Sequence, residues 1–255
     1  DECGVCGGDG TSCQGAAVFF AEYAEGSSNN KYLEIYNGTD QVIDLSGYAY
    51  PNATNGANTE GTYDYWNEFD AGATINPGDI YVICHPSADD QIQAYCDQEH
   101  TYLSNGDDGF CLVQGTESSF TVLDCVGDWN GDPGAGWDVA GVEDATKDHT
   151  LIRKPEINSG NPNWTESAGT SASNSEWIVH EQNYWNNLGF HMTDVNHDCT
   201  EFITIDSPSP FGAYDMIGNL SEIVVSDDLL FLRGGDFYNM QDHQEAKNVF
   251  IDEQK

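Results

Sequence analysis

Cysteines are the residues of this chain whose type and spacing most directly suggest chemistry. The 255 residues contain eight of them, at positions 3, 6, 13, 84, 96, 111, 125 and 199. The Cys3-x-x-Cys6 spacing suits a zinc site, thiol redox chemistry or a secreted disulfide framework. Glycine-rich residues 7–10 follow it, whereas a redox pair normally opens a helix, and three thiols without a nearby histidine do not complete a four-ligand zinc site. Disulfides fit best, and they predict an oxidising, extracellular compartment.

The segment CLVQGTESSFTVLDC, residues 111–125, has the alternating pattern of a β-hairpin. A turn centred near Ser118 places Cys111 opposite Cys125 on the partner strand. The pattern therefore predicts a Cys111–Cys125 disulfide across the hairpin.

Cys84 and Cys96 flank a short connecting segment, in which Ser87 and Asp90 resemble the capping box that starts a helix. A Cys84–Cys96 disulfide would fasten this segment to its strand, and we predict that bond as well.

Acidic loops are the candidates for calcium binding. In DWNGDPG, side-chain oxygens recur at the first, third and fifth positions, a spacing that lets them converge on a hard cation: Asp128, Asn130 and Asp132. DVNHD repeats this spacing with Asp194, Asn196 and Asp198. Neither loop has the glycine and glutamate of an EF-hand at the sixth and twelfth positions. The sequence predicts calcium as a cofactor, and no organic cofactor.

Catalytic motifs are missing from the sequence. It contains no Gly-x-Ser-x-Gly, His-Glu-x-x-His, P-loop or dinucleotide fingerprint. The histidines cluster once, with acids, in HMTDVNHDCTE: His191, Asp194, His197, Asp198 and Glu201. A transition-metal site and a solvated linker both fit this segment, and the linker is the preferred interpretation. We therefore predict no catalytic residues and a protein that is not an enzyme.

The charge balance is strongly acidic, with 44 Asp and Glu against 7 Lys and Arg and a formal net charge of −37. Such a surface repels nucleic acid and anionic lipid and attracts divalent cations. No run of about 18 apolar residues is present, so direct membrane insertion is not expected. The composition argues against nucleic acid as a partner and suits a saline medium.

From Val18 onward, short apolar or alternating segments recur between Gly, Asn and Pro turns, which is typical of an antiparallel sandwich or barrel. In KYLEIYN, Leu33 and Ile35 share one face and Glu34 points to the other. Arg153 and Lys154 are two of the few basic residues, and we expect structural salt bridges for them.

The opening DECGVCGGDGTSC resembles the Asp/Cys/Gly-rich repeats of large secreted bacterial surface proteins. That resemblance implies a piece of a longer chain and raises the expectation of calcium.

Further along, FFAEYAEGSSNNKYLEIYNGT, IDLSGY, LSNGDDGFCLV, GWDVAGVEDATKDHTLIRKPEI and ASNSEWIVHEQNYWNNLG together resemble a bacterial lamin-tail domain. This resemblance covers about residues 17–191 and implies an all-β, immunoglobulin-like antiparallel β-sandwich. Members occur in secreted bacterial proteins as accessory, binding or structural modules, sometimes beside nuclease or phosphatase domains. No catalytic residues are attributed to the module.

FGAYDMIGNLSEIV and FLRGGDFYN resemble part of the formylglycine-generating-enzyme fold. The matching residues are Gly212, Tyr214, Asp215, Met216, Gly218, Asn219, Glu222, Arg233, Gly234 and Gly235. Ser221 and Ile223 replace tryptophans of that pattern, and its cysteine pair after the Arg-Gly-Gly turn is missing. We expect a non-catalytic extension.

Three segments are therefore predicted: a Cys/Gly/Asp-rich repeat fragment at 1–16, the lamin-tail-like sandwich at 17–191 and the extension at 192–255. The predicted function is a non-catalytic structural or adhesive module of a large bacterial cell-surface or appendage protein. The alternative is an accessory or targeting module of a secreted hydrolase such as an extracellular nuclease. Expected partners are neighbouring domains or other subunits of a surface assembly, and carbohydrate or protein ligands.

Overall fold

The described part of the chain comprises residues 18–193, 222–226 and 229–233 of a computed structural model. The chain divides into two compact units, one of which spans Thr11–Asp194. The other unit contains a two-stranded antiparallel hairpin of β13 (Glu222–Ser226) and β14 (Leu229–Arg233). Within the described residues, no helix is both long and apolar enough to cross a bilayer.

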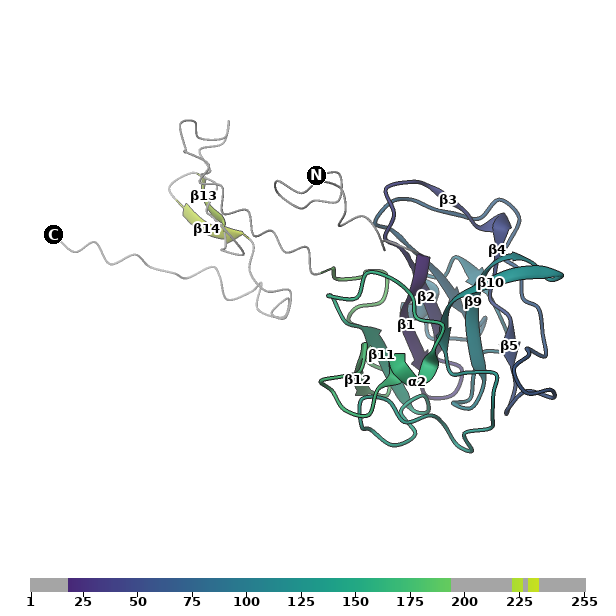
Figure 1. Cartoon of the computed structure of the whole chain (residues 1–255). Coiled ribbons are helices and arrows are strands. Elements are labelled where there is room, and N and C mark those ends of the chain that lie inside the picture. Colours follow the sequence, from purple (N-terminus) through teal and green to yellow (C-terminus); the bar gives the residue numbers. More distant parts are fainter. Residues whose placement is uncertain (1–17, 194–221, 227–228, 234–255) are drawn as a thin grey trace. The chain divides into compact units, whose positions relative to one another are not determined.

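One six-stranded sheet forms the first layer of the fold (Figure 1). Its strand order is β12-β11-β1-β2-β7-β8, and the strands are β1 (Val18–Glu25), β2 (Lys31–Asn37), β7 (Ile80–Cys84), β8 (Gln98–Glu99), β11 (His149–Arg153) and β12 (Trp177–Glu181). Neighbouring strands are antiparallel except β7 and β8. Every residue of β1 and β2 is buried, because both faces of these central strands are covered.

A smaller antiparallel sheet forms the second layer (Figure 1). It consists of β10 (Ser119–Val126), β9 (Gly109–Thr116), β4 (Tyr48–Ala49) and β5 (Asn52–Ala53), which also pairs with β9. The remaining elements are short: β3 (Ile43–Asp44), β6 (Thr74–Ile75), the 3₁₀ helix η2 (Leu45–Gly47), and helices α1 (Asp90–Gln93) and α2 (Trp164–Ala168). The molecule is all-β, as predicted.

The main core lies between the two sheets. Alternate residues of the first sheet, such as Phe20, Leu33 and Ile35, pack with Phe110 and Leu112 of the second. A bulge between Phe20 and Glu22 shifts the register of β1 against β2. The hydrophobic burial of this shared core accounts for the two-layer arrangement.

Both predicted disulfides are present. Cys111 and Cys125 are direct partners in the β9–β10 register and form a disulfide. The turn is centred between Glu117 and Ser118, and a bulge near Leu123 shifts the register by one residue, which brings the two cysteines opposite each other. The Cys84–Cys96 bond joins the end of β7 to the segment that contains α1.

The predicted start of α1 was wrong. Its N-cap is Asp89, whose Oδ1 accepts a hydrogen bond from the Gln91 backbone N–H at 3.4 Å. Ser87 lies too early to cap this four-residue helix, and its own N–H donates to Nδ1 of His85.

The expected salt bridge of Arg153 is present. Its guanidinium donates to Asp124 at 2.5 Å and to Glu176 at 2.6 Å, and it stacks on the Trp177 ring at 3.9 Å. Lys154 differs from the prediction, because its Nζ donates to the Ala172 carbonyl oxygen instead.

Candidate functional site

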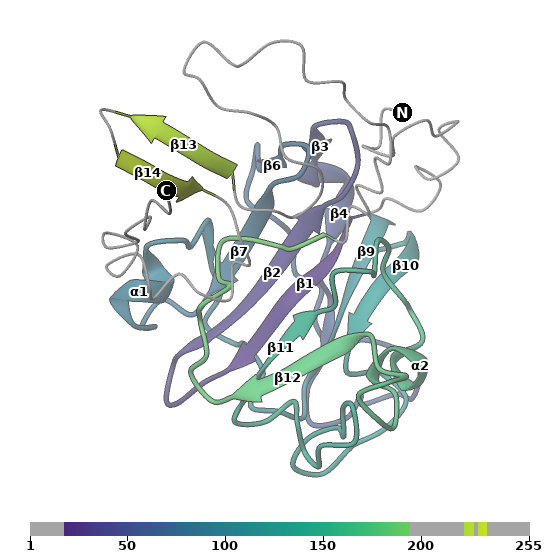
Figure 2. The same ribbon diagram turned by 90° about the vertical axis from the view of Figure 1, so that its left-hand side faces the viewer.

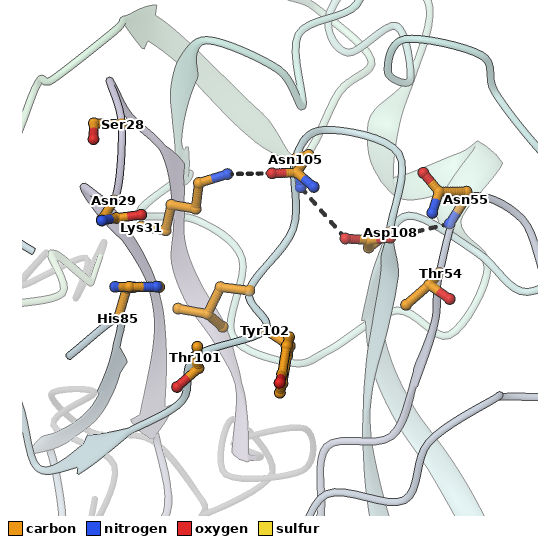
Figure 3. A pocket seen from close by; sticks show the side chains of 11 residues that line it. Ser28, Asn29, Lys31, Thr54, Asn55, His85, Thr101, Tyr102, Asn105 and Asp108 are labelled. Atoms are coloured by element: carbon orange, nitrogen blue, oxygen red, sulfur yellow. Dashed lines mark hydrogen bonds between the residues drawn. The ribbon is translucent and has the colours of Figure 1, made fainter. Parts of the chain in front are cut away.

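A pocket of about 260 Å³ lies where several loops meet at one end of the sheets (Figure 3). The β1–β2 turn, the residue after β7, the residues after β5 and the loop between β8 and β9 all contribute to its walls. Most of the lining side chains carry neutral hydroxyl or amide groups, and the full set is Ser28, Asn29, Lys31, Thr54, Asn55, His85, Thr101, Tyr102, Leu103, Asn105 and Asp108.

The β1–β2 turn forms one wall. The Gly26 N–H donates to the Asn30 carbonyl at 2.8 Å, and Ser28 adopts a left-handed conformation with φ of 62°. A distant side chain supports the turn, since Asn183 Oδ1 accepts from the Ser27 N–H at 2.9 Å. This wall is therefore fixed from outside the turn as well as from within it.

Lys31 brings a positive charge to the pocket wall, but its ammonium group is fully engaged. Nζ forms an ion pair with Glu25 Oε1 and donates to the Ser104 carbonyl and to Asn105 Oδ1, each at 2.8 Å. An ammonium group has three N–H donors, so these partners use all of them. The lysine therefore organises the wall and offers no free donor to a ligand.

Asp108 is engaged in the same way. Its Oδ1 accepts from the Asn55 N–H at 3.0 Å and its Oδ2 from the Asn105 N–H at 3.4 Å (Figure 3). Burial raises the pKa of the Asp108 carboxyl, and the two backbone donors oppose that rise. The carboxylate thus joins the loop of Asn105 to the strand end at Asn55.

His85 supplies a neutral ring. Its Nδ1 accepts from the Ser87 N–H at 3.0 Å, which assigns the ring proton to Nε2. Burial, and secondarily the nearby Lys31 charge, lowers the pKa of His85 below its ordinary value of 6.5. At neutral pH the histidine is a hydrogen-bonding group without a charge.

Tyr102 is the exposed aromatic residue of the pocket, with 78% of its surface accessible. Its ring lies edge-on to His100, with centroids 6.5 Å apart. An exposed ring beside hydroxyl and amide groups can contact the apolar face of a ligand while its neighbours bind polar edges.

The predicted calcium ligands lie elsewhere. Asp128 Oδ1 accepts from the Asn130 N–H at 2.7 Å and Asp132 Oδ1 from the Gly134 N–H at 2.8 Å, so both carboxylates cap local turns. Across the described ranges, no group of three or more His, Cys, Asp or Glu is placed to hold a metal ion. Asp194, Asn196 and Asp198 lie outside these ranges, and calcium binding stays a prediction.

The histidine cluster is only partly described. His191 packs edge-on against Phe19 and beside Tyr36, and His197, Asp198 and Glu201 lie outside the described residues, as does Asp194. Burial lowers the pKa of His191 to about 4, so this imidazole is a neutral packing group.

Sequence reasoning missed the pocket. Its residues come from four separate segments, and only their three-dimensional pairing brings them together. One signal was available in principle: Lys31 is one of seven basic residues in a strongly acidic chain and follows the Asn-rich turn of residues 26–30.

Residues 11–127 match the family model described as Lamin Tail Domain, which supports the lamin-tail resemblance for this part of the chain. The whole pocket and both disulfides lie within the match, while β11 and β12 lie beyond it. The repeat fragment at 1–16 and the enzyme-like tail at 192–255 stay predictions.

A solved structure is also similar: the crystal structure of a DUF4876 family protein from Bacteroides thetaiotaomicron VPI-5482 at 2.50 Å resolution. The similarity covers 71% of this chain and 75% of that chain, with 12% sequence identity and a TM-score of 0.42. No curated protein matches the chain.

Proposed function

We propose that this β-sandwich is a non-catalytic module of a larger extracellular protein, in which it serves a structural or adhesive role by binding a neutral, hydroxyl-rich ligand such as a carbohydrate. One observation carries the proposal. The pocket exposes neutral polar groups and a tyrosine ring, whereas its two charged side chains are engaged within the fold.

The electrostatics favour a neutral ligand over a polyanion. A phosphate needs cationic donors, and the donors of Lys31 already bind Glu25, Ser104 and Asn105. The net charge of −37 adds long-range repulsion. Nucleic acid therefore fits the pocket poorly, which argues against a role in delivering a nuclease to its substrate.

The chemistry of the pocket favours binding over catalysis. His85 Nδ1 is occupied by a backbone N–H, so the ring has no free acceptor nitrogen to serve as a general base. The cysteines at 84, 96, 111 and 125 are paired in disulfides and provide no thiolate. The two disulfides also support the extracellular location, because such bonds persist in oxidising compartments.

The test uses the full chain in two assays. A panel of neutral, amino and acidic oligosaccharides is screened for binding, and hits are measured by calorimetry with Tyr102→Ala. We expect a neutral saccharide to bind and Tyr102→Ala to weaken it about tenfold, the loss of about 1.4 kcal/mol of contact energy.

The matched control is Tyr65→Ala, because Tyr65 is also exposed, at 58%, but lies outside the pocket. It should leave the affinity unchanged. Equal losses in both variants, or binding of acidic saccharides alone, would overturn the proposal. Turnover of glycosidic or phosphodiester substrates by the full chain would contradict the non-catalytic role.

A further inference from the structure

Two glutamates face each other at the centre of the six-stranded sheet, on the face away from the main core. Glu22 of β1 and Glu34 of β2 are direct partners in the antiparallel register. They are 1% and 0% exposed. Two adjacent ionised carboxylates at such burial would repel each other strongly, so the pair needs a compensating group.

Each carboxyl has one satisfied and one unsatisfied oxygen. Tyr32 donates its hydroxyl to Glu22 Oε1, and the Gly189 N–H donates to Glu34 Oε2 at 2.8 Å. Glu22 Oε2 and Glu34 Oε1 are buried without a hydrogen-bond partner. A proton between these two oxygens would satisfy both of them at once.

Among the described residues, no cation forms an ion pair with Glu22 or Glu34 that could replace that proton. The ion pairs of the described residues join Lys31 to Glu25, and Arg153 to Asp124 and Glu176. Opposite the pair in register, β7 presents Val82 and β11 presents Ile152. The other titratable or charged groups near this face include Tyr32, Tyr36, Tyr95 and the neutral His191, whose pKa the charge of Arg153 helps to lower.

The segment of residues 182–193, here called the strap, covers this face (Figure 2). Trp185 and Leu188 pack on a cluster that includes Tyr32 and Val82, and His191 packs on Phe19. Gly189 bonds to Glu34 and has no room for a side chain, since an added Cβ would lie 2.3 Å from the Tyr95 ring. The strap therefore excludes water from the two carboxyls.

We propose that Glu22 and Glu34 share one proton in a carboxyl–carboxylate hydrogen bond, and that this bond is a pH-sensitive latch for the strap. At neutral pH the proton is held and the strap stays closed. At alkaline pH hydroxide removes the proton as water, leaving two adjacent buried anions. Hydration of these anions requires water to enter, so the strap lifts from the sheet.

The pKa directions agree with this geometry. Burial raises the pKa of Glu22 to about 8, against the opposing hydrogen bond from Tyr32. Burial together with the charge of Glu22 raises the pKa of Glu34 well above 4.5, although the Gly189 and Phe190 backbone N–H groups both oppose that rise. Because the charge of Glu22 further raises the pKa of Glu34, the pair keeps its shared proton through neutral pH and loses it only at alkaline pH.

The test measures hydrogen–deuterium exchange of strap peptides in the full chain between pH 6 and pH 10, corrected for the intrinsic pH dependence of exchange. In Glu34→Gln the amide N–H replaces the shared proton, while its oxygen can still accept from Gly189. We expect strap protection in the wild type to fall at least tenfold between pH 7 and pH 9.5, and protection in Glu34→Gln to stay nearly constant. Glu143→Gln, which removes an exposed carboxylate, should behave as the wild type.

Glu22→Gln provides a second variant should Glu34→Gln fail to fold, because its amide can donate to Glu34 Oε1 while its oxygen accepts from Tyr32. Infrared spectroscopy gives a direct readout: the wild type at pH 7 should show the band of a buried protonated carboxyl, and Glu22→Gln should lose it. Wild-type protection that stays flat, a parallel loss in the Gln variants, or absence of the carboxyl band would overturn the proposal.

Discussion

The same pair of strands compensates buried charge in two different ways. At the pocket end of β1 and β2, Glu25 stands opposite Lys31 and the two form an ion pair at 2.8 Å. Three residues along each strand, Glu22 stands opposite Glu34, and neither forms an ion pair with any residue that the structure describes. Opposite charges neutralise the first pair, whereas we propose that the second depends on a shared proton. Two buried carboxylates on the same strand are therefore stabilised by different groups, a lysine for Glu25 and, as we propose, a shared proton for Glu22.

The difference matches what covers each pair. The Glu25–Lys31 pair lies at a polar edge of the sheet, where the Ser104 carbonyl and the Asn105 side-chain amide oxygen also accept hydrogen bonds from the ammonium group. The acid pair lies under the strap, where Leu188, Trp185 and Val82 form an apolar cluster.

The largest expected effect comes from breaking the lysine pair. Lys31→Met leaves Glu25 buried without its cation and removes the bonds to Ser104 and Asn105. We expect the free energy of unfolding to fall by about 3–5 kcal/mol in urea denaturation at pH 7. Lys154→Met is the matched control, since Lys154 forms no ion pair within the described part of the chain, and it should cost about 1 kcal/mol or less. Equal effects of the two substitutions would contradict the assigned role of Lys31.

A smaller change in the free energy of unfolding should distinguish the Glu22–Glu34 pair from the Glu25–Lys31 pair by its dependence on pH. A carboxyl whose pKa is raised on folding contributes stability that is complete below its ordinary pKa of 4.5 and is lost as the pH rises through the folded value, about 8 for Glu22. The wild type should therefore lose stability between pH 5 and pH 8. Glu34→Gln should equal the wild type at pH 5 and be more stable by about 1–2 kcal/mol at pH 8.

Glu25→Gln sharpens the contrast, because it removes the counter-charge of Lys31 and should destabilise the fold at both pH values, by about 1–3 kcal/mol. Urea denaturation at pH 5 and pH 8 gives the change in the free energy of unfolding for Glu34→Gln and for Glu25→Gln at each pH. A Glu34→Gln variant that is less stable than the wild type at pH 8 would show that the acid pair is ionised and satisfied by other means.

The sequence predicted the sheets better than the sites. Alternation in residues 31–37 placed Leu33 and Ile35 on one face and Glu34 on the other, and the hairpin pattern paired Cys111 with Cys125. These features follow from the period of a strand and from local turns. The alternation gave no sign that Glu34 is buried, because the strap that covers it is more than 140 residues away along the chain.

The pocket was unpredictable for the same physical reason. Asn55, Lys31, His85 and Tyr102 are polar residues of unremarkable type in separate segments, and only the sheet pairing brings them to one wall. The loop at Asp128 has the spacing of a calcium ligand set, and Oδ1 of Asp128 and of Asp132 each accept a hydrogen bond from the backbone of their own turns; calcium binding there stays a prediction. The spacing of residues in the sequence indicates which side chains could come together, but only the fold shows which of them already form hydrogen bonds.

In the proposed binding mode, the charged groups of the pocket are engaged within the fold and neutral groups face the ligand. The most direct test is the affinity of the saccharide selected in the screen, measured by calorimetry at about 50 mM and about 500 mM NaCl. Salt ions at the higher concentration shield exposed charges and weaken the interactions between them, but they leave neutral hydrogen bonds and ring contacts unchanged. We expect the two dissociation constants to agree within about twofold. An affinity that falls tenfold or more with salt would show instead that a free charge binds the ligand.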